Sequence, residues 1–285
     1  MSSTARKYPL HGWIGVGLVA VFWSLNWSLS GVRTQWAFFP LWLGYCLTID
    51  ALVLWRTGTS LFFRSHRKYL LLFIFSAPVW WLFELANARL QNWHYQGAEV
   101  FSPLMFWFWA TINFTTVIPA VLGSAELMRS YFTKPVKGPF IQPSRMTTSI
   151  FFLTGWTMVA LMVIWPGIFF PFIWVSLFFI LEPVNIWLGH RSLLEWLKDG
   201  NWQPVVALWL GVLLTAFFWE MWNYLSYPKW IYHVPWGNWL HIFEMPVLGY
   251  GGYLPFALEI FALYHFLAGL FGEKKTDYVM NFPEA

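Results

Sequence analysis

Two stretches of the sequence place a carboxylate and an amide one helical turn apart near the end of a long apolar segment. Glu220 is followed by Asn223, and Glu84 is followed by Asn87. Residues three or four apart share a helix face, so Tyr224 lies on the face of Glu220. A carboxyl group in apolar surroundings favours its neutral form, which can donate a proton as a general acid. We therefore predict acid–base chemistry with Glu220 as the principal acid; the candidate catalytic residues are Glu220, Glu84, Glu244, Asn223 and Asn87.

Aromatic residues gather around both acids. Several of the 23 tryptophans fall between positions 219 and 239, and a Trp-x-Tyr sequence follows each acid. One interpretation is the aromatic belt of membrane proteins at the lipid–water interface. The other is an aromatic-walled cavity, because ring faces stabilise cations, including a carbocation formed when an alkene is protonated. The candidate substrate-binding residues are Trp219, Trp222, Trp230, Tyr232, Tyr224, Trp93, Tyr95 and Glu259.

The composition indicates a polytopic membrane protein. Of the 285 residues, 58% are hydrophobic and 11% are charged, whereas soluble domains carry about 25% charged residues. Apolar runs of about 20 residues, long enough to span a bilayer as helices, recur along the chain. We predict an all-α fold of eight transmembrane helices within residues 10–30, 36–55, 69–88, 102–124, 147–165, 168–188, 204–225 and 240–271. The last segment contains Pro246, Gly249 and Pro255, so we expect it to be broken.

The basic residues predict the orientation. With the N-terminus inside, the outer loops contain only Arg33, Arg89 and Lys229, and the other lysines and arginines of the 17 lie on the inner side. Cytoplasmic loops carry such an excess. We expect both termini in the cytoplasm, a first span that is retained, and a bacterial cytoplasmic membrane. The net charge of +4 then reports orientation and not nucleic-acid binding.

An internal repeat accompanies the eight spans. Asp50 recurs as Glu182 and Glu84 recurs as Glu220, and the offset along the chain drifts between 131 and 137 positions. Four spans in each half give the halves the same orientation, related by an axis along the membrane normal. We predict a first four-helix repeat at 1–128, a basic cytoplasmic linker at 129–146, a second repeat at 147–272 and a cytoplasmic tail at 273–285.

The acids within or beside the spans leave three functional hypotheses open; they are Asp50, Glu84, Glu182, Glu220, Glu244 and Glu259. Intramembrane carboxylates are costly when charged and commonly functional. One hypothesis is the enzyme described above. A proton- or cation-coupled transporter or channel would need a polar path from Glu84 and Glu220 on the outer side to Asp50 and Glu182 on the inner side. A non-catalytic lipid-binding subunit would use the acids for hydrogen bonds between helices.

Cofactor signatures are weak. His233 and His241 are candidate metal ligands beside Glu220 and Glu244, but the sequence has no HxxxH or HExxH pair and Cys46 is its only cysteine. Nucleotide-binding glycine motifs are also missing from the sequence. We predict no metal and no other cofactor. The expected partner is a membrane lipid or another hydrophobic substrate, and no nucleic acid.

The repeated pattern of an acid, a Trp-x-Tyr sequence and a proline in the next span resembles the membrane lycopene cyclase-domain family. The residues that carry the resemblance are Glu84, Trp93, Tyr95 and Pro119 in the first half, and Glu220, Trp230, Tyr232, Pro255 and Glu259 in the second. The hallmark Pro-x-Glu-Glu of that family is absent here. The resemblance implies repeated helical units whose acids protonate an alkene of a carotene. It leads us to expect a cyclase- or isomerase-like enzyme acting on an isoprenoid or carotenoid-like lipid.

Overall fold

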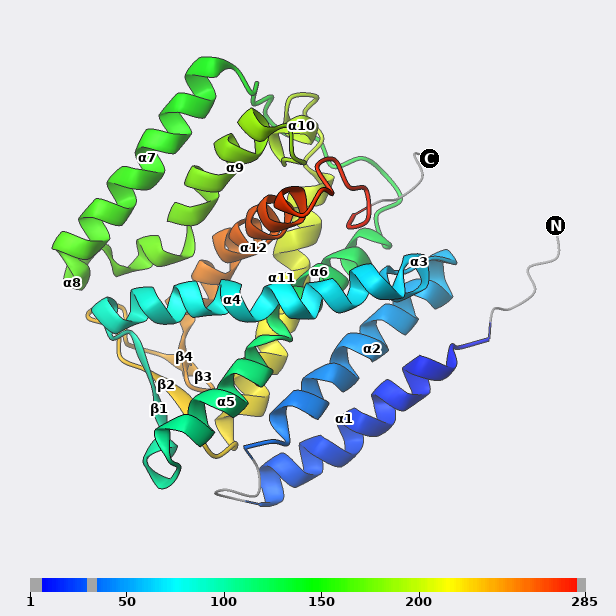
Figure 1. The fold of residues 1–285 in the computed structure, drawn as a ribbon, viewed down its shortest axis with the longest axis vertical. Helices are drawn as coiled ribbons and strands as arrows, with labels where there is room; N and C mark the ends of the chain where they lie inside the picture. Colours follow the sequence, from blue (N-terminus) through cyan, green and yellow to red (C-terminus); the bar gives the residue numbers. More distant parts are fainter. Residues whose placement is uncertain (1–6, 30–34, 281–285) are drawn as a thin grey trace.

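The structure is a computed structural model in which residues 7–29 and 35–280 are described. Arg6 and Arg33, which entered the prediction of orientation, lie outside these residues, as does the end of the predicted tail. The described chain is mostly helical, as predicted. By length and composition, seven of its helices could cross a membrane, and the number becomes eight if one bent pair is a single span. Figure 1 shows their arrangement.

The first half of the chain runs from α1 to α6. Its elements are α1 (Leu10–Ser28), α2 (Phe38–Thr57), α3 (Leu61–Arg64), α4 (His66–Leu90), strand β1 (Trp93–Gln96), the 3₁₀ turn η2 (Ala98–Val100), α5 (Pro103–Phe114) and α6 (Val117–Arg129). Serine side chains begin several of these helices: Ser65 accepts from the Lys68 N–H at 3.2 Å, and Ser102 accepts from the Met105 N–H at 3.3 Å. The predicted segments of this half lie over α1, α2, α4 and the α5–α6 pair, and their ends differ from those of the helices by at most five residues.

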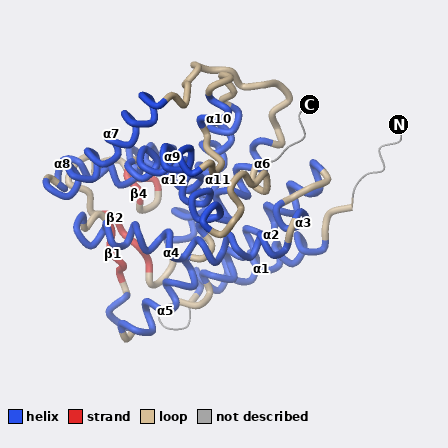
Figure 2. The backbone as a smooth tube through the Cα atoms, turned by 45° about the horizontal axis from the view of Figure 1, so that its top comes forward, coloured by secondary structure: helices blue, strands red, loops and turns tan. Residues whose placement is uncertain are grey.

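The second half runs from α7 to α12. Its elements are α7 (Arg145–Ile164), α8 (Pro166–Phe169), η3 (Phe170–Trp174), α9 (Ser176–Leu188), α10 (Leu194–Leu197), α11 (Gln203–Tyr224), β2 (Lys229–Tyr232), β3 (His241–Ile242), β4 (Met245–Pro246), η4 (Val247–Gly249) and α12 (Tyr250–Leu270). The tube view in Figure 2 shows the strands gathered in one region while helices make up most of the molecule.

The break in the spans lies elsewhere than the sequence predicted. Residues 240–246 form turns and the β3–β4 hairpin, and α12 then runs without interruption from Tyr250 to Leu270. Pro255 is tolerated in α12 because it lies near the start of the helix, where its missing N–H forfeits a bond only to the carbonyl of Gly251. The sharp bend lies instead between Pro166–Trp174 and Ser176–Leu188, which meet at an angle of 43° and form either a broken span or a re-entrant loop.

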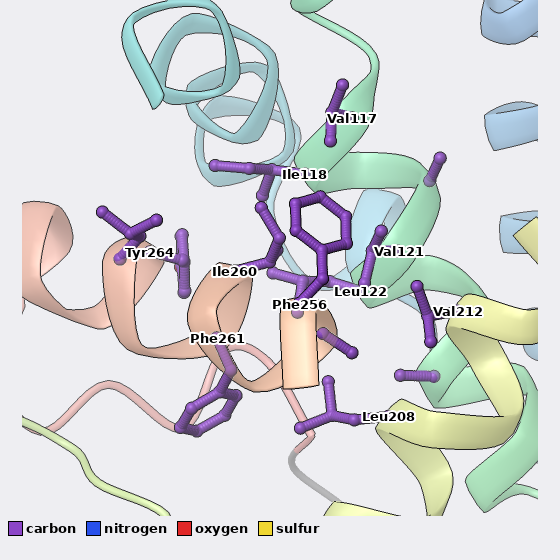
Figure 3. Packing of buried hydrophobic residues seen from close by; sticks show 14 of the residues in the cluster. Val117, Ile118, Val121, Leu122, Leu208, Val212, Phe256, Ile260, Phe261 and Tyr264 are labelled. Carbon is purple, nitrogen blue, oxygen red and sulfur yellow. The ribbon is translucent and has the colours of Figure 1, made fainter. Parts of the chain in front are cut away.

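The centre of the bundle is an apolar contact between α6, α11 and α12 (Figure 3). Val121 and Leu122 of α6, Val212 of α11, and Phe256 and Ile260 of α12 are 0–1% exposed. Close packing of this kind holds helices together in lipid, where burial of apolar surface gives no net gain.

A substitution at Gly211 tests this contact. A Cβ atom built at Gly211 of α11 would lie 2.4 Å from the backbone nitrogen of Ala125 in α6, a distance at which the helices must separate. We expect Gly211→Ala to lower the free energy of unfolding by about 1–3 kcal/mol, the usual cost of overpacking. Thermal unfolding in detergent measures it. Gly17→Ala is the matched control, since a Cβ there meets no atom within 4 Å; equal midpoints for the two variants would contradict the prediction.

The C-terminal segment is not a free tail. Tyr278, Val279 and Met280 are only 6%, 2% and 1% exposed, and the Tyr278 hydroxyl donates to the carbonyl oxygen of Leu61 at 2.8 Å. This segment covers the end of the bundle where α2 ends and α4 begins. We call this the basic end, because it holds Arg56, Arg64, Arg67, Lys68, Arg129, Arg191, Lys274 and Lys275.

Candidate functional site

A two-stranded sheet joins the two Trp-x-Tyr sequences. Strands β1 and β2 pair antiparallel, with Trp93 opposite Tyr232 and Tyr95 opposite Trp230. Each tryptophan therefore faces the tyrosine of the other copy across the sheet. The strands follow α4 and α11, the helices that carry the Glu–Asn pairs, so the sheet draws both candidate stretches to one place. We call this end of the bundle the cavity end.

The two asparagines hold the strands against their helices. The Asn87 side-chain amide donates to the carbonyl oxygen of Trp93 at 2.8 Å and accepts from the Trp93 N–H at 3.3 Å. The Asn223 amide makes the same two bonds to Trp230, at 2.7 and 2.9 Å. Both asparagines are therefore committed to backbone groups. In this structure they position the strands, whereas the sequence analysis named them as candidate catalytic residues.

Glu84 is bonded by three donors on a single oxygen. Its Oε1 accepts from the indole N–H of Trp80 at 3.0 Å, from that of Trp93 at 3.1 Å, and from the Tyr95 hydroxyl at 2.5 Å. The residue is 8% exposed. Three donors satisfy a buried carboxylate oxygen that would otherwise be costly in this apolar environment.

Glu220 is bonded by two tyrosines. Its Oε1 accepts from the Tyr232 hydroxyl at 2.7 Å and from the Tyr253 hydroxyl at 2.6 Å, and Trp230 in turn donates to the Tyr232 oxygen at 2.9 Å. Glu220 is fully buried, and its Oε2 has no hydrogen-bond partner among the described residues. Tyr253 was not predicted from the sequence, because nothing near it in the chain indicates that α12 brings it to Glu220.

The strand tyrosines remain donors. Burial, followed by the negative charge of Glu220, raises the pKa of the Tyr232 phenol well above its usual value of 10. Burial and the neighbouring Glu84 act in the same way on the pKa of Tyr95. Both phenols therefore keep their protons throughout the physiological range and can donate or relay a proton, but neither serves as a base.

A cavity of about 550 Å³ opens between these residues. Aromatic side chains dominate its wall, which includes Trp80, Trp93, Tyr95, Phe106, Trp174, Trp219, Trp230, Tyr232, Tyr253 and Phe256. This volume lies within the range of ligand sites in proteins. At about 30 Å³ per water-sized group it has room for roughly 20 such groups. Glu84 and Glu220 do not line it, but each bonds side chains that do.

Some predicted substrate-binding residues lie away from the cavity. Trp222 is 1% exposed and packs against Trp42. Tyr224 is 45% exposed, and its ring lies under the Lys229 ammonium group, which also pairs with Glu244. Neither Trp222, Tyr224 nor Glu244 lines the cavity. The shared helix face of Glu220 and Tyr224 therefore does not bring these two side chains to a common ligand site.

Three further acids bind backbone N–H groups. Asp50 accepts from Phe62 at 2.9 Å, Glu182 accepts from Leu194 at 2.8 Å, and Glu259 accepts from Leu177 at 2.9 Å. These donors lie in the first turns of α3, α10 and α9, whose N–H groups have no partner within their own helix. The three acids thus cap the N-termini of these helices from a neighbouring element. Glu259 does not line the cavity.

The candidate metal ligands do not form a cluster. In the part of the chain that the structure describes, no three His, Cys, Asp or Glu side chains come together as a metal site. His241 is exposed, and its Nε2 lies 3.0 Å from Oδ1 of Asn238. His233 is tied by its backbone N–H to the carbonyl oxygen of Asn92.

Comparisons with known proteins identify no relative of this chain: no family model, no curated protein and no solved structure matches it. The class of protein is therefore defined by its own features: a helical chain with several helices able to span a membrane, and an aromatic cavity backed by two buried carboxylates.

Proposed function

We propose that the chain is an eight-span membrane enzyme built from two like-oriented four-helix repeats. Contacts at matching positions support the repeat. Asp50 receives the Ser60 hydroxyl at 2.7 Å and the Phe62 N–H. Glu182 receives the N–H of Leu194, which follows Phe62 by the same 132 positions that separate Glu182 from Asp50.

A close glycine contact between neighbouring helices occurs in both halves. A Cβ at Gly15 of α1 would lie 2.7 Å from the Thr48 nitrogen of α2. A Cβ at Gly155 of α7 would lie 2.9 Å from the Ile180 nitrogen of α9, and Ile180 follows Thr48 by 132 positions. The two glycines are 140 positions apart, so α1 and α7 are shifted against each other by eight residues relative to α2 and α9. A glycine at the closest approach is nevertheless common to the pairs α1–α2 and α7–α9, which supports reading them as copies. The exchange of Trp and Tyr across β1–β2 is what a two-fold axis between the halves would produce.

The proposed orientation places the basic end in the cytoplasm and the cavity end on the opposite side. Among the described residues, only two lysines or arginines lie at the cavity end: Arg89 in the last turn of α4 and Lys229 just after α11. The cytoplasmic side of membrane proteins is enriched in lysine and arginine. Both termini then belong to the cytoplasm.

The proposed activity is acid–base chemistry on the apolar part of an isoprenoid-like lipid held in the cavity. One observation carries it: two buried carboxylates each hydrogen-bond to tyrosines whose rings form the cavity wall. The apolar wall excludes water from a reactive cation, and its ring faces stabilise positive charge. A proton donor within hydrogen-bond reach contributes about 10²–10⁴-fold to a rate. A cyclase- or isomerase-like reaction, as in the family that the sequence resembles, needs no cofactor.

The full chain in lipid nanodiscs tests the activity. Lycopene, a linear isoprenoid polyene, is supplied in D2O, and products are separated and weighed by mass spectrometry. Acid–base chemistry should place solvent deuterium in the product. We expect Glu220→Gln to lower turnover at least 100-fold and Glu84→Gln to lower it by a smaller factor. Glu195→Gln at the basic end is the control. Unchanged turnover in both variants, or no conversion of lycopene and of the lipids extracted with the protein, would refute the proposal.

A second candidate is a lipid-binding protein without chemistry. It is favoured by the finding that Glu84 and Glu220 lie behind the cavity wall and not in it. In that case the two glutamine variants would bind the same lipid as the wild type, with a lower thermal midpoint and no chemical change in the lipid. Mass spectrometry of the extracted lipid separates the two candidates, because only an enzyme accumulates unconverted substrate when Glu220 is replaced.

A transporter has less support. It would need a polar path from Glu84 and Glu220 at the cavity end to Asp50 and Glu182 near the basic end. The intervening core is filled by apolar side chains of α6, α11 and α12 (Figure 3). The polar trio in this core, Tyr45, Ser124 and Thr215, is bonded within itself at 2.7–3.4 Å. Asp50 and Glu182 are occupied with backbone N–H groups.

A further inference from the structure

We propose that Tyr253 is the catalytic residue that contacts the substrate and passes the proton of Glu220 to it. This inference rests on the proposed function and assigns the reaction to the second half of the chain. The carboxyl group of Glu220 is fully buried and does not line the cavity, whereas Tyr253 does. The 2.6 Å hydrogen bond between them is therefore a direct connection from the acid to the ligand space.

The ring of Tyr253 is held in a fixed position. It stacks on Trp219 with 6.1 Å between ring centroids and 26° between planes, and it lies 6.4 Å from the ring of Phe256. Both neighbours also line the cavity. A side chain fixed by packing can hold its hydroxyl within reach of a bound ligand, which is the geometry that proton transfer requires.

The two halves of the chain differ at this point. Glu84 receives two indole N–H groups and one phenol. An indole N–H is a donor only, so among the three groups on Glu84 only the Tyr95 phenol, the counterpart of Tyr232, could accept a proton and pass it on. Glu220 receives two phenols instead, and a phenol both accepts and donates. By the offset of 136 that relates Glu84 to Glu220, the position of Tyr253 corresponds to Val117 in the first half, which has no hydroxyl.

The proton transfer balances within the site. The unpartnered Oε2 leaves Glu220 room to carry a proton. When the Tyr253 O–H turns toward the cavity, its proton passes to an alkene carbon of the substrate. The Glu220 carboxyl group turns so that its protonated oxygen faces the phenol, and the carboxyl proton moves to the phenol oxygen. The C=C π bond is lost and a C–H bond forms, leaving a carbocation and the Glu220 carboxylate. After rearrangement the cation loses a different proton through Tyr253 to Glu220, which restores the acid without a co-reactant.

Tyr253→Phe tests the relay because it removes the hydroxyl and keeps the ring. With lycopene in nanodiscs we expect kcat to fall at least 100-fold and KM to change less than threefold, with solvent deuterium incorporation falling in proportion to kcat. Tyr250→Phe is the matched control. Its phenol is three residues earlier and bonds the carbonyl oxygen of Ile242 at 3.1 Å instead of Glu220, so its kcat should equal that of the wild type.

The outcomes separate this inference from the proposed function. If Glu220→Gln abolishes turnover while Tyr253→Phe keeps more than one-tenth of the wild-type kcat, the relay is wrong and the enzyme remains. If the wild type converts no lipid, both are wrong. Should Tyr253→Phe fail to fold, 3,5-difluorotyrosine at position 253 keeps the hydroxyl and makes it more acidic. A relay then predicts a changed rate and pH profile, and a profile identical to that of the wild type would overturn it.

Discussion

Replacing Glu126 with leucine is expected to lower the free energy of unfolding by about 3–5 kcal/mol, the cost of removing one partner of a buried ion pair. Glu126 is 0% exposed and lies near the end of α6. Its Oε1 pairs with the guanidinium group of Arg64 and accepts from the Met280 N–H at 3.0 Å. Leucine fills a similar volume, but it leaves the positive charge of Arg64 in a buried site without its counter-charge.

The loss should extend to the C-terminal segment. Met280 is bonded through its N–H to Glu126 and through its carbonyl oxygen to Arg129, so the variant should expose residues 277–280 to protease. Urea unfolding in detergent micelles and limited proteolysis measure the two effects. Glu195→Leu is the control, because its partly exposed pair with Arg191 contributes about 0–1 kcal/mol. A loss below 1 kcal/mol for Glu126→Leu would contradict the prediction.

Glu126 shows where sequence reasoning stopped. The predicted span ended at residue 124, whereas α6 continues to Arg129, so Glu126 was assigned to no span and no role. Its partners Arg64 and Met280 are 62 and 154 residues away in the chain. Hydrophobic periodicity reports the length of a span but not the distant groups that meet at its end.

The parts predicted well are those that hydrophobicity and local spacing determine. The positions of the long helices follow from long apolar runs, and their ends are confirmed to within five residues except in the last segment, which was predicted to begin at 240 whereas α12 begins at Tyr250. The sequence indicated that Trp93–Tyr95 and Trp230–Tyr232 are copies of one pattern, but not that they lie side by side. The pairing itself depends on where α4 and α11 end, and the pattern carries no information about that register.

The candidate site was predicted in its centre and missed at its edge. The Trp-x-Tyr residues of both copies line one cavity, and each glutamate bonds the tyrosine of its own copy behind the wall, because the same short sequence follows each helix. Tyr253 was missed because its bond to Glu220 spans 33 residues and a hairpin whose path the sequence does not reveal. Tyr224 and Trp222 were included because they neighbour Glu220 in sequence, yet they do not line the cavity.

Replacing Trp42 with alanine is expected to lower the free energy of unfolding by about 3–5 kcal/mol, the range for deleting a buried tryptophan. Trp42 of α2 is 0% exposed. Its ring lies 5.3 Å from that of Trp219 and 5.0 Å from those of Trp222 and Tyr45. The space that it leaves lies directly behind Trp219, a residue of the cavity wall. We therefore expect the cavity wall to lose rigidity in addition to the loss of stability of the whole protein.

Two measurements separate the structural effect from the effect on the site. Urea unfolding should give the loss of stability, and Trp42→Phe should recover part of it because a ring still supports Trp219. Trp156→Ala is the control, since Trp156 is 51% exposed on α7 and should change the free energy of unfolding by less than about 0.5 kcal/mol. Lipid retained through purification should fall in Trp42→Ala and stay at the wild-type level in Trp156→Ala. If Trp42→Ala were destabilised but retained its lipid in full, Trp219 would hold the cavity wall without support from α2.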